Sequence, residues 1–143
     1  MTNLIQAWST EGPKEKLQIR GFTLEELGED QVEVQILACG ICASDIDAIN
    51  GKYGDLYRFP MIPGHEGVGK VVAIGKSVKG LRIGDRVGLG VYRNTCGTCR
   101  FCVSGRDNLC EKKEMMFAQN YGCFSNRVYL RPSLIMGKFK NQH

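Results

Sequence analysis

Four cysteines lie close together in the chain, at a spacing that suits one tetrahedral metal ion. Cys96, Cys99, Cys102 and Cys110 are separated by two, two and seven residues. Structural zinc prefers four ligands and binds thiolates at ~2.3 Å. Four sulfur ligands leave no position for a substrate, so we expect a structural site. Zinc bound there would order a polar segment with little hydrophobic pattern, because the binding energy adds to the folding energy.

Two other chemistries for these cysteines stay open. The first is a set of free or disulfide-bonded thiols. The chain has seven cysteines, an odd number, and residues 1–10 do not resemble a signal peptide. No run approaches the ~18 apolar residues of a membrane span. We therefore expect a cytoplasmic protein without a membrane partner, in a compartment where disulfides are rare. The second is an iron–sulfur cluster, but the wide last gap and Glu111 after Cys110 do not match a ferredoxin-type run.

A cysteine and a histidine elsewhere could form a second, catalytic metal site. Cys42 follows a predicted strand, and His65 and Glu66 follow a predicted turn. Catalytic zinc keeps one position open for water or substrate, where it acts as a Lewis acid. Asp45 could orient His65 by accepting its second ring N–H. A structural histidine and a small buried cysteine are ordinary roles for the same residue types, so the pair alone leaves both interpretations open.

Short alternating segments predict the strands that position these residues. Val32, Val34 and Ile36 lie on one face of a segment that alternates polar and apolar residues, as in a half-buried strand. Turns containing glycine or proline separate such segments. The sequence therefore predicts a mainly β, antiparallel barrel and not a parallel α/β sheet. The predicted strands are residues 17–22, 31–38, 70–74, 86–92 and 124–130.

Little helix is expected between these strands. One short helix after Cys42 would be capped by Ser44 or Asp45, whose side chains can accept a backbone N–H of the first turn. A second short turn is expected from Pro132. The cysteine-rich residues 95–110 depart from the strand pattern, which predicts an irregular lobe.

The length and charge of the chain limit its function. The 143 residues fit one domain, by a prior of roughly 100–200 residues per domain, and leave no room for a complete dinucleotide-binding domain as well. Gly67-x-Gly69-x-x-Val72 is only a near match to the nucleotide fingerprint, and it runs into β-branched residues where a helix is needed. Hydrophobic residues make up 43% of the chain, typical of a globular protein, and a net charge of +4 without a basic run argues against nucleic acid.

The segment around the histidine resembles a known signature. Gly64-His65-Glu66-x2-Gly69-x5-Gly75 is similar to the zinc signature of the medium-chain alcohol dehydrogenases. The resemblance covers residues 32–130, and residues 59–63 and 121–125 are most similar to the cinnamyl-alcohol-dehydrogenase and microbial aldehyde-reductase branch. Three further motifs follow the same order as in that family: Gly40-x-Cys42-x-Ser44-Asp45, Gly84-Asp85-Arg86-Val87 and the four-cysteine run.

The resemblance implies a fold and a domain organisation. It implies a GroES-like antiparallel β-barrel over residues 1–136, with a few short helices and a zinc lobe at about residues 93–113. Residues 137–143 would be an unrelated or disordered tail, because they show no helical or strand period. The Rossmann domain of the family would be absent from this chain.

The resemblance also implies a function. Cys42 and His65 would bind a catalytic zinc, Glu66 would be a nearby acid that can become a ligand, and Ser44 would take the alcohol proton. The enzyme would interconvert alcohols with aldehydes or ketones by hydride transfer. Its cofactors would be one structural zinc, one catalytic zinc and NAD or NADP. Its substrate partner would be a small alcohol or aldehyde, and a homodimer is one option for its assembly.

The sequence departs from the family at several positions. Ala43 stands where many relatives carry arginine or histidine, and Asp47 stands where many carry a histidine that completes a proton relay. An aspartate, with a usual pKa of ~3.9, is a weaker base near neutrality. The third protein ligand of the catalytic zinc and the nucleotide-binding fold would lie beyond the last residue. We therefore expect the chain alone to have no turnover, and no cofactor-binding residue is assigned.

Alternatives and unassigned residues remain. The main alternative is a non-enzymatic GroES-like zinc module for partner binding or thiol redox sensing, and a polyol dehydrogenase is a further option within the enzyme class. Cys39 is expected to pack in the core, and Cys123 is either a packing residue or a free thiol. His143, at the end of the chain, is not expected to bind metal.

Overall fold

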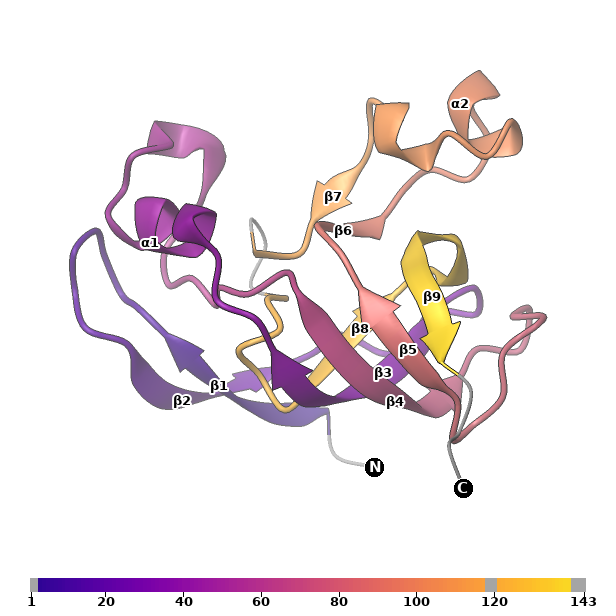
Figure 1. Ribbon diagram of the computed structural model, residues 1–143, viewed down its shortest axis with the longest axis horizontal. Coiled ribbons are helices and arrows are strands. Elements are labelled where there is room, and N and C mark those ends of the chain that lie inside the picture. Colours follow the sequence, from indigo (N-terminus) through magenta and orange to yellow (C-terminus); the bar gives the residue numbers. More distant parts are fainter. Residues whose placement is uncertain (1–2, 118–120, 140–143) are drawn as a thin grey trace.

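The chain folds into antiparallel β-sheets with few helices (Figure 1). The computed structural model describes residues 3–117 and 121–139. The predicted mainly β fold is confirmed. The strands are β1 (Leu4–Ser9), β2 (Gln18–Thr23), β3 (Val32–Cys39), β4 (Gly67–Ile74), β5 (Arg86–Leu89), β6 (Tyr92–Asn94), β7 (Glu114–Met115), β8 (Arg127–Leu130) and β9 (Ile135–Phe139). The helices are α1 (Ala43–Ile49) and α2 (Arg100–Val103), with short 3-10 turns at Gly54–Leu56, Asp107–Leu109 and Pro132–Leu134.

The central sheet has the strand order β8-β3-β4-β5-β9 and separates two apolar clusters. Successive side chains of a strand point to opposite faces. On β8, Val128 and Leu130 therefore join the larger cluster, while Tyr129 joins the smaller one. The larger cluster also contains Val32, Val34, Val71 and Val87, which are fully buried.

The β1–β2 ribbon covers the smaller cluster. Ile5 and Ala7 of β1 are buried in it beside Tyr129. Isolated bridges join Ala7 to Ser125 and Thr10 to Met61, so the ribbon is tied to the loop before β8 and to the segment before β4. Figure 1 shows the ribbon at the side of the sheet below α1, away from the lobe that carries α2.

The predicted strands occur with shifted ends, and three strands escaped prediction. β4 begins at Gly67, three residues before the predicted start. The predicted strand 86–92 is broken after Leu89, and β6 starts a separate two-stranded sheet with β7. β1 was missed although its burial alternates residue by residue. β7, with two residues, is too short to give a pattern.

The expectation that the chain is irregular from residue 137 is wrong for residues 137–139. Strand β9 pairs with β5, with Arg86 opposite Phe139 and Val87 opposite Lys138, and forms one edge of the central sheet. Its residue types do not alternate between polar and apolar, so the strand has no visible period in the sequence. The remainder of the predicted tail, including His143, lies outside the described residues.

The helix after Cys42 is present, but its predicted cap is wrong. Helix α1 begins at Ala43, so Cys42 is the N-cap and Asp45 is the third helical residue. The Cys42 N–H donates a hydrogen bond of 2.9 Å to Asp45 Oδ2. Asp45 therefore satisfies the helix start by reaching backward, as the third residue of a capping box does, and Ser44 has no capping role. The predicted short turn at Pro132 is confirmed.

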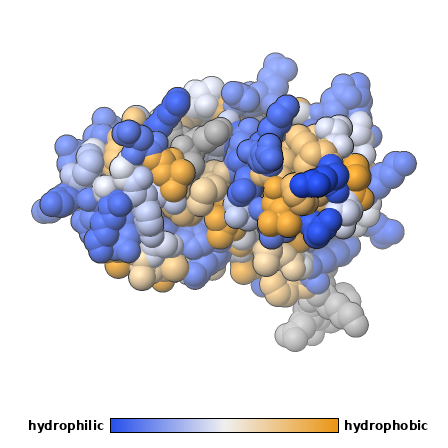
Figure 2. Space-filling model, turned by 90° about the horizontal axis from the view of Figure 1, so that it is seen from above, coloured by the Kyte–Doolittle hydropathy of each residue, from blue (hydrophilic) through white to orange (hydrophobic). Residues whose placement is uncertain are grey.

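Several large apolar side chains remain uncovered on the described part of the chain. Ile41, Val103 and Met136 are each more than 70% exposed. In the view from above, apolar residues reach the surface in patches between charged ones (Figure 2). No helix among the described residues is long and apolar enough to span a bilayer.

Candidate metal centres

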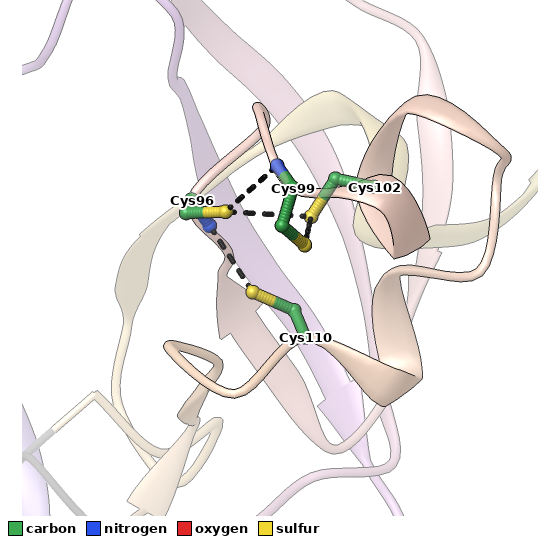
Figure 3. A group of neighbouring side chains, drawn as sticks. All are labelled: Cys96, Cys99, Cys102 and Cys110. Atoms are coloured by element: carbon green, nitrogen blue, oxygen red, sulfur yellow. Dashed lines mark hydrogen bonds between the residues drawn. The ribbon is translucent and has the colours of Figure 1, made fainter.

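The four cysteines predicted to bind zinc converge in a lobe beyond β6 (Figure 3). All four sulfur atoms lie within 4.8 Å of one another. Cys96 Sγ is 3.9 Å from Cys102 Sγ, and Cys99 Sγ is 3.5 Å from Cys102 Sγ. A tetrahedron with metal–sulfur bonds of ~2.3 Å has sulfur–sulfur edges of about 3.8 Å, whereas a disulfide bond is ~2.05 Å long. The spacing therefore fits a four-sulfur metal site and not disulfides.

The turns of the lobe direct backbone N–H groups at the sulfurs. The Cys99 N–H donates to Cys96 Sγ at 3.3 Å, and the Cys96 N–H donates to Cys110 Sγ at 3.5 Å. Hydrogen bonds from the backbone at Thr98 and then at Cys99 lower the pKa of Cys96 to about 6. Burial raises the pKa of Cys102 to about 11. Cys96 is therefore the thiolate that forms most readily before a cation binds.

The lobe has almost no apolar interior of its own. None of the residues in α2 or in the turn Asp107–Leu109 is buried. Gly97 has a φ of 72°, and a Cβ there would lie 2.6 Å from Arg131 Nη2. The Arg131 side chain donates to the Thr95 carbonyl at 3.2 Å, which links the lobe to the end of β8. That a metal ion bound to the four sulfurs orders this lobe stays a prediction, and the lack of an apolar interior is consistent with it.

The second predicted set also converges. Cys42, at the start of α1, meets His65 and Glu66, which directly precede β4, with their ligand atoms within 4.8 Å of one another. β3 and β4 are antiparallel, so the last residue of β3 and the first residue of β4 lie at the same end of the strand pair. The Gly40 N–H donates to the Glu66 carbonyl at 3.0 Å and extends this pairing. Strand pairing thus joins residues 23 positions apart in the sequence.

Asp45 holds the histidine in place. Its carboxylate is 1% exposed and accepts the N–H groups of Cys42 and Gly64 at 2.9 Å each. Asp45 Oδ1 also lies 3.2 Å from His65 Nδ1, so the predicted contact is present. When Nδ1 carries the ring proton, it donates a hydrogen bond to Asp45. Nε2 then keeps a free lone pair that can bind a cation. Phe117 packs on the His65 ring with centroids 5.0 Å apart and restricts its orientation.

The remaining predicted site residues lie nearby but are not part of this cluster. Ser44 is half-buried in the first turn of α1, two residues after Cys42. Asp47, one turn of α1 further on, forms an ion pair with Lys52 at 2.6 Å. This pair raises the pKa of Lys52. The Asp47 carboxylate is therefore paired with Lys52 and not with a residue of the cluster.

Two features of the site were given no role by the sequence analysis. Phe117 is distant from the motifs, and nothing in its surroundings indicates that it packs on His65. Gly40 lies against Glu66: a Cβ there would be 2.3 Å from Glu66 Oε2. Any other residue at position 40 would push the carboxylate away, so this glycine serves close packing. Cys39 is half-buried against the larger core cluster, and Cys123 is buried within it.

Known proteins are similar to this chain in sequence and in fold. Residues 28–138 match the family model described as the alcohol dehydrogenase GroES-like domain. The aldehyde reductase AdhA of Synechocystis is 39% identical over 125 residues, which cover 87% of this chain and 37% of that protein. The cinnamyl alcohol dehydrogenase 1 of Ocimum basilicum is 40% identical over 106 residues, covering 74% of this chain and 29% of that protein.

A solved structure gives the same picture in three dimensions. The CAD of Helicobacter pylori, complexed with NADP(H), superposes with a TM-score of 0.84 at 28% identity, covering 96% of this chain and 42% of that one. The expected GroES-like fold is therefore confirmed. The chain spans less than half the length of each of these proteins.

Proposed function

Because this chain belongs to the alcohol dehydrogenase GroES-like domain family, we propose that it is the zinc-binding catalytic part of an oxidoreductase that interconverts alcohols with aldehydes or ketones. The observation that carries the proposal is the convergence of Cys42, His65 and Glu66, with the buried Asp45 holding His65. A protein that used the barrel only as a scaffold would have no need for this arrangement. The non-enzymatic zinc module is therefore the weaker alternative.

The first zinc would be structural. Cys96, Cys99, Cys102 and Cys110 would hold it, and the sulfur spacings of 3.5 and 3.9 Å support this assignment. All four positions of a tetrahedral ion would be filled by thiolates. This zinc would hold the lobe of residues 93–113 against the barrel.

The second zinc would be catalytic. Cys42, His65 and Glu66 would hold it, and three protein ligands would leave one position for a substrate oxygen. The bound ion would supply Lewis acidity toward an alcohol or carbonyl oxygen. The Cys42 thiolate and the Glu66 carboxylate would balance its charge. His65 would stay neutral, with its proton on Nδ1 and hydrogen-bonded to Asp45.

The chain's own groups would handle the alcohol proton. The hydroxyl of Ser44, two residues from Cys42, would accept it and pass it on to solvent. The Asp47 carboxylate is engaged by Lys52 at 2.6 Å, so we do not assign it the relay role that a histidine would have at that position. In this proposal Ser44 orients the substrate and relays its proton, because the hydroxyl's own proton leaves to solvent as the substrate proton arrives, and Asp45 acts only through His65.

The hydride would pass to or from NAD or NADP. The H. pylori relative was solved with NADP(H), and relatives are named aldehyde reductase and cinnamyl alcohol dehydrogenase. We therefore propose a small alcohol or aldehyde as the substrate. The described residues contain no parallel α/β sheet that could carry the nucleotide. Residues 1–143 by themselves should then give no NAD(P)-linked turnover.

Counting zinc tests the metal assignment. Elemental analysis with native mass spectrometry should find two zinc ions per chain in the wild type. One ion should remain in Cys42→Ser and one in Cys99→Ser, because each change opens a different site. A single ion in the wild type that survives Cys42→Ser would contradict the catalytic site and leave the structural one intact.

A chimera tests the activity. Residues 1–139 would replace the corresponding part of AdhA, so that the nucleotide-binding part comes from that relative. The chimera should reduce aldehydes with NADPH, and its Cys42→Ser version should not. A chimera that folds and binds two zinc ions but gives no turnover with any of a panel of aldehydes, while AdhA does, would refute the proposed reaction.

A further inference from the structure

Two cysteines outside both metal centres lie on the same side of the β3–β4 pair. Cys39 ends β3 and is directly opposite Gly67 on β4. Opposed residues of an antiparallel pair point to the same face, with Cβ atoms about 4.5–5.5 Å apart. Gly67 has no side chain, and a Cβ there would lie 2.7 Å from Cys123 Sγ. The Cys123 sulfur thus fills the space across from the Cys39 side chain.

The two thiols are close enough to change each other's acidity. Interaction with the Cys123 side chain lowers the pKa of Cys39, whereas interaction with the Cys39 side chain, together with burial, raises the pKa of Cys123. A Cβ at Gly64 would lie 3.1 Å from Cys39 Sγ. The absence of side chains at positions 64 and 67 therefore leaves the space that both sulfurs occupy.

The two sulfurs differ in exposure. Cys39 is half-buried, whereas Cys123 is 2% exposed. Both line a surface depression of about 480 Å³ whose wall includes Trp8, Ile19 and Phe124. A small oxidant can enter such a depression and reach the Cys39 sulfur, whereas Cys123 is shielded from solvent. An accessible thiol next to a protected partner is the arrangement found in reversible thiol switches.

We propose that Cys39 and Cys123 form a redox pair that closes to a disulfide when hydrogen peroxide oxidises it and reopens with a thiol reductant. The Cys39 sulfur attacks the peroxide, its O–O bond breaks, and a sulfenic acid forms while the other oxygen leaves as water. The Cys123 sulfur then attacks the Cys39 sulfur, forming the S–S bond and releasing the second oxygen as water with the Cys123 proton. Two electrons pass from the two sulfurs to the peroxide, which is the oxidant.

The pair does not depend on the proposed function, since neither sulfur belongs to a metal group. Its position nevertheless gives a closed disulfide a structural effect. It would tie the end of β3 to the loop before β8, with the two sulfurs ~2.05 Å apart in the space beside Gly64 and Gly67. Those two glycines flank His65 and Glu66.

The test is disulfide mapping on the reduced, zinc-loaded chain. After stepwise addition of hydrogen peroxide, the chain is unfolded in denaturant, so that buried thiols also react, free thiols are blocked with N-ethylmaleimide, and the peptides are analysed by mass spectrometry. We expect two alkylation sites to be lost together and a cross-linked peptide to appear, with both effects reversed by dithiothreitol. Trypsin leaves Cys39 and Cys42 on one peptide, 21–52, so fragmentation between them must place the bond on Cys39.

Single variants provide the matched controls. Cys123→Ser should leave Cys39 as a sulfenic acid that dimedone traps, because the resolving thiol is gone. Cys39→Ser should leave Cys123 unmodified, because it is buried. If either variant does not fold, the wild-type mapping decides alone. A disulfide on Cys42, or loss of zinc-lobe thiols while Cys39 and Cys123 both stay alkylatable, would overturn the proposal.

Discussion

Replacing Asp45 by asparagine should weaken metal binding at the second cluster, because this carboxylate has three partners. Oδ2 accepts the Cys42 N–H at 2.9 Å, while Oδ1 accepts the Gly64 N–H at 2.9 Å and faces His65 Nδ1 at 3.2 Å. Asparagine has the same shape but only one oxygen. In either orientation its NH₂ group would face at least one N–H donor inside a site where residue 45 is 1% exposed.

The two orientations have different costs. If the amide oxygen faces Gly64 and His65, the Cys42 N–H loses its acceptor, which costs about 1–3 kcal/mol for a buried donor. If the oxygen faces Cys42, the NH₂ group faces His65, and the ring must move its proton to Nε2, the atom that would bind the ion. Loss of a partner that orients a ligand typically costs 10–100-fold in metal affinity, or ~1.4–2.8 kcal/mol.

The assay is a zinc titration against a chromophoric chelator, with denaturant unfolding of the metal-free chain beside it. Asp45→Asn should lower the affinity of the weaker zinc by 10–100-fold, while the four-cysteine zinc serves as an internal reference and keeps its affinity. Asp47→Asn is the matched control on the same helix, because its partner Lys52 is an exposed side chain and the pair lies at the surface. If Asp45→Asn and Asp47→Asn both bind two zinc ions within twofold of the wild type, the role given to Asp45 is wrong.

Three further perturbations test other parts of the structure. Cys99→Ser should remove one zinc and make the lobe cleavable by protease while the barrel stays folded; equal sensitivity to the wild type would argue against a metal-dependent lobe. Gly67→Ala should destabilise the chain by about 1–3 kcal/mol in denaturant unfolding, because its Cβ would meet the Cys123 sulfur at 2.7 Å, whereas Gly137→Ala, with open space around it, should have little effect. In the metal-free chain, as long as the lobe keeps its hydrogen bonds, alkylation of Cys96 should rise with a midpoint near pH 6, below the ordinary thiol pKa of 9.0. Because folding lowers the pKa of Cys96, this thiolate stabilises the lobe fully above pH 9, and the stabilisation is lost as the pH falls through 6. The lobe should therefore become less stable between pH 9 and pH 6. An alkylation midpoint near pH 9 would contradict the hydrogen bonding described for this thiol.

The four-cysteine cluster was predictable because its spacing is local. Four sulfurs within one loop can reach one ion with no help from the sheet, so the sequence alone fixes their meeting. Cys42 and His65 differ, because 23 positions separate them and only strand pairing brings them together. Residue types alone left that site open, and the family resemblance was needed to connect its two halves.

The errors in the strand and helix predictions have physical causes as well. β9 was missed because its residue types do not alternate between polar and apolar, and the strand is defined by its backbone pairing with β5. Asp45 was expected to accept a backbone N–H of the first turn, yet it accepts the N–H of Cys42, because Cys42 is the N-cap and Asp45 is the third helical residue. Phe117 reaches His65 through tertiary packing, for which the sequence has no periodic signal.

Glycines at the β3–β4 edge explain why two kinds of sulfur chemistry can lie side by side. At Gly40 the missing side chain admits the Glu66 carboxylate, and at Gly67 it admits the Cys123 thiol. The same end of the β3–β4 pair thus lies beside both the Cys42–His65–Glu66 cluster and the Cys39–Cys123 pair, and the register of β3 on β4 helps to position both. A rigid sheet with loops at its end is the usual support for reactive groups, because the register sets their positions while the loops supply the side chains. Moving that register by one residue would separate Cys39 from Cys123 and Cys42 from His65 at the same time, so any variant that disturbs the β3–β4 ladder should lose both properties together.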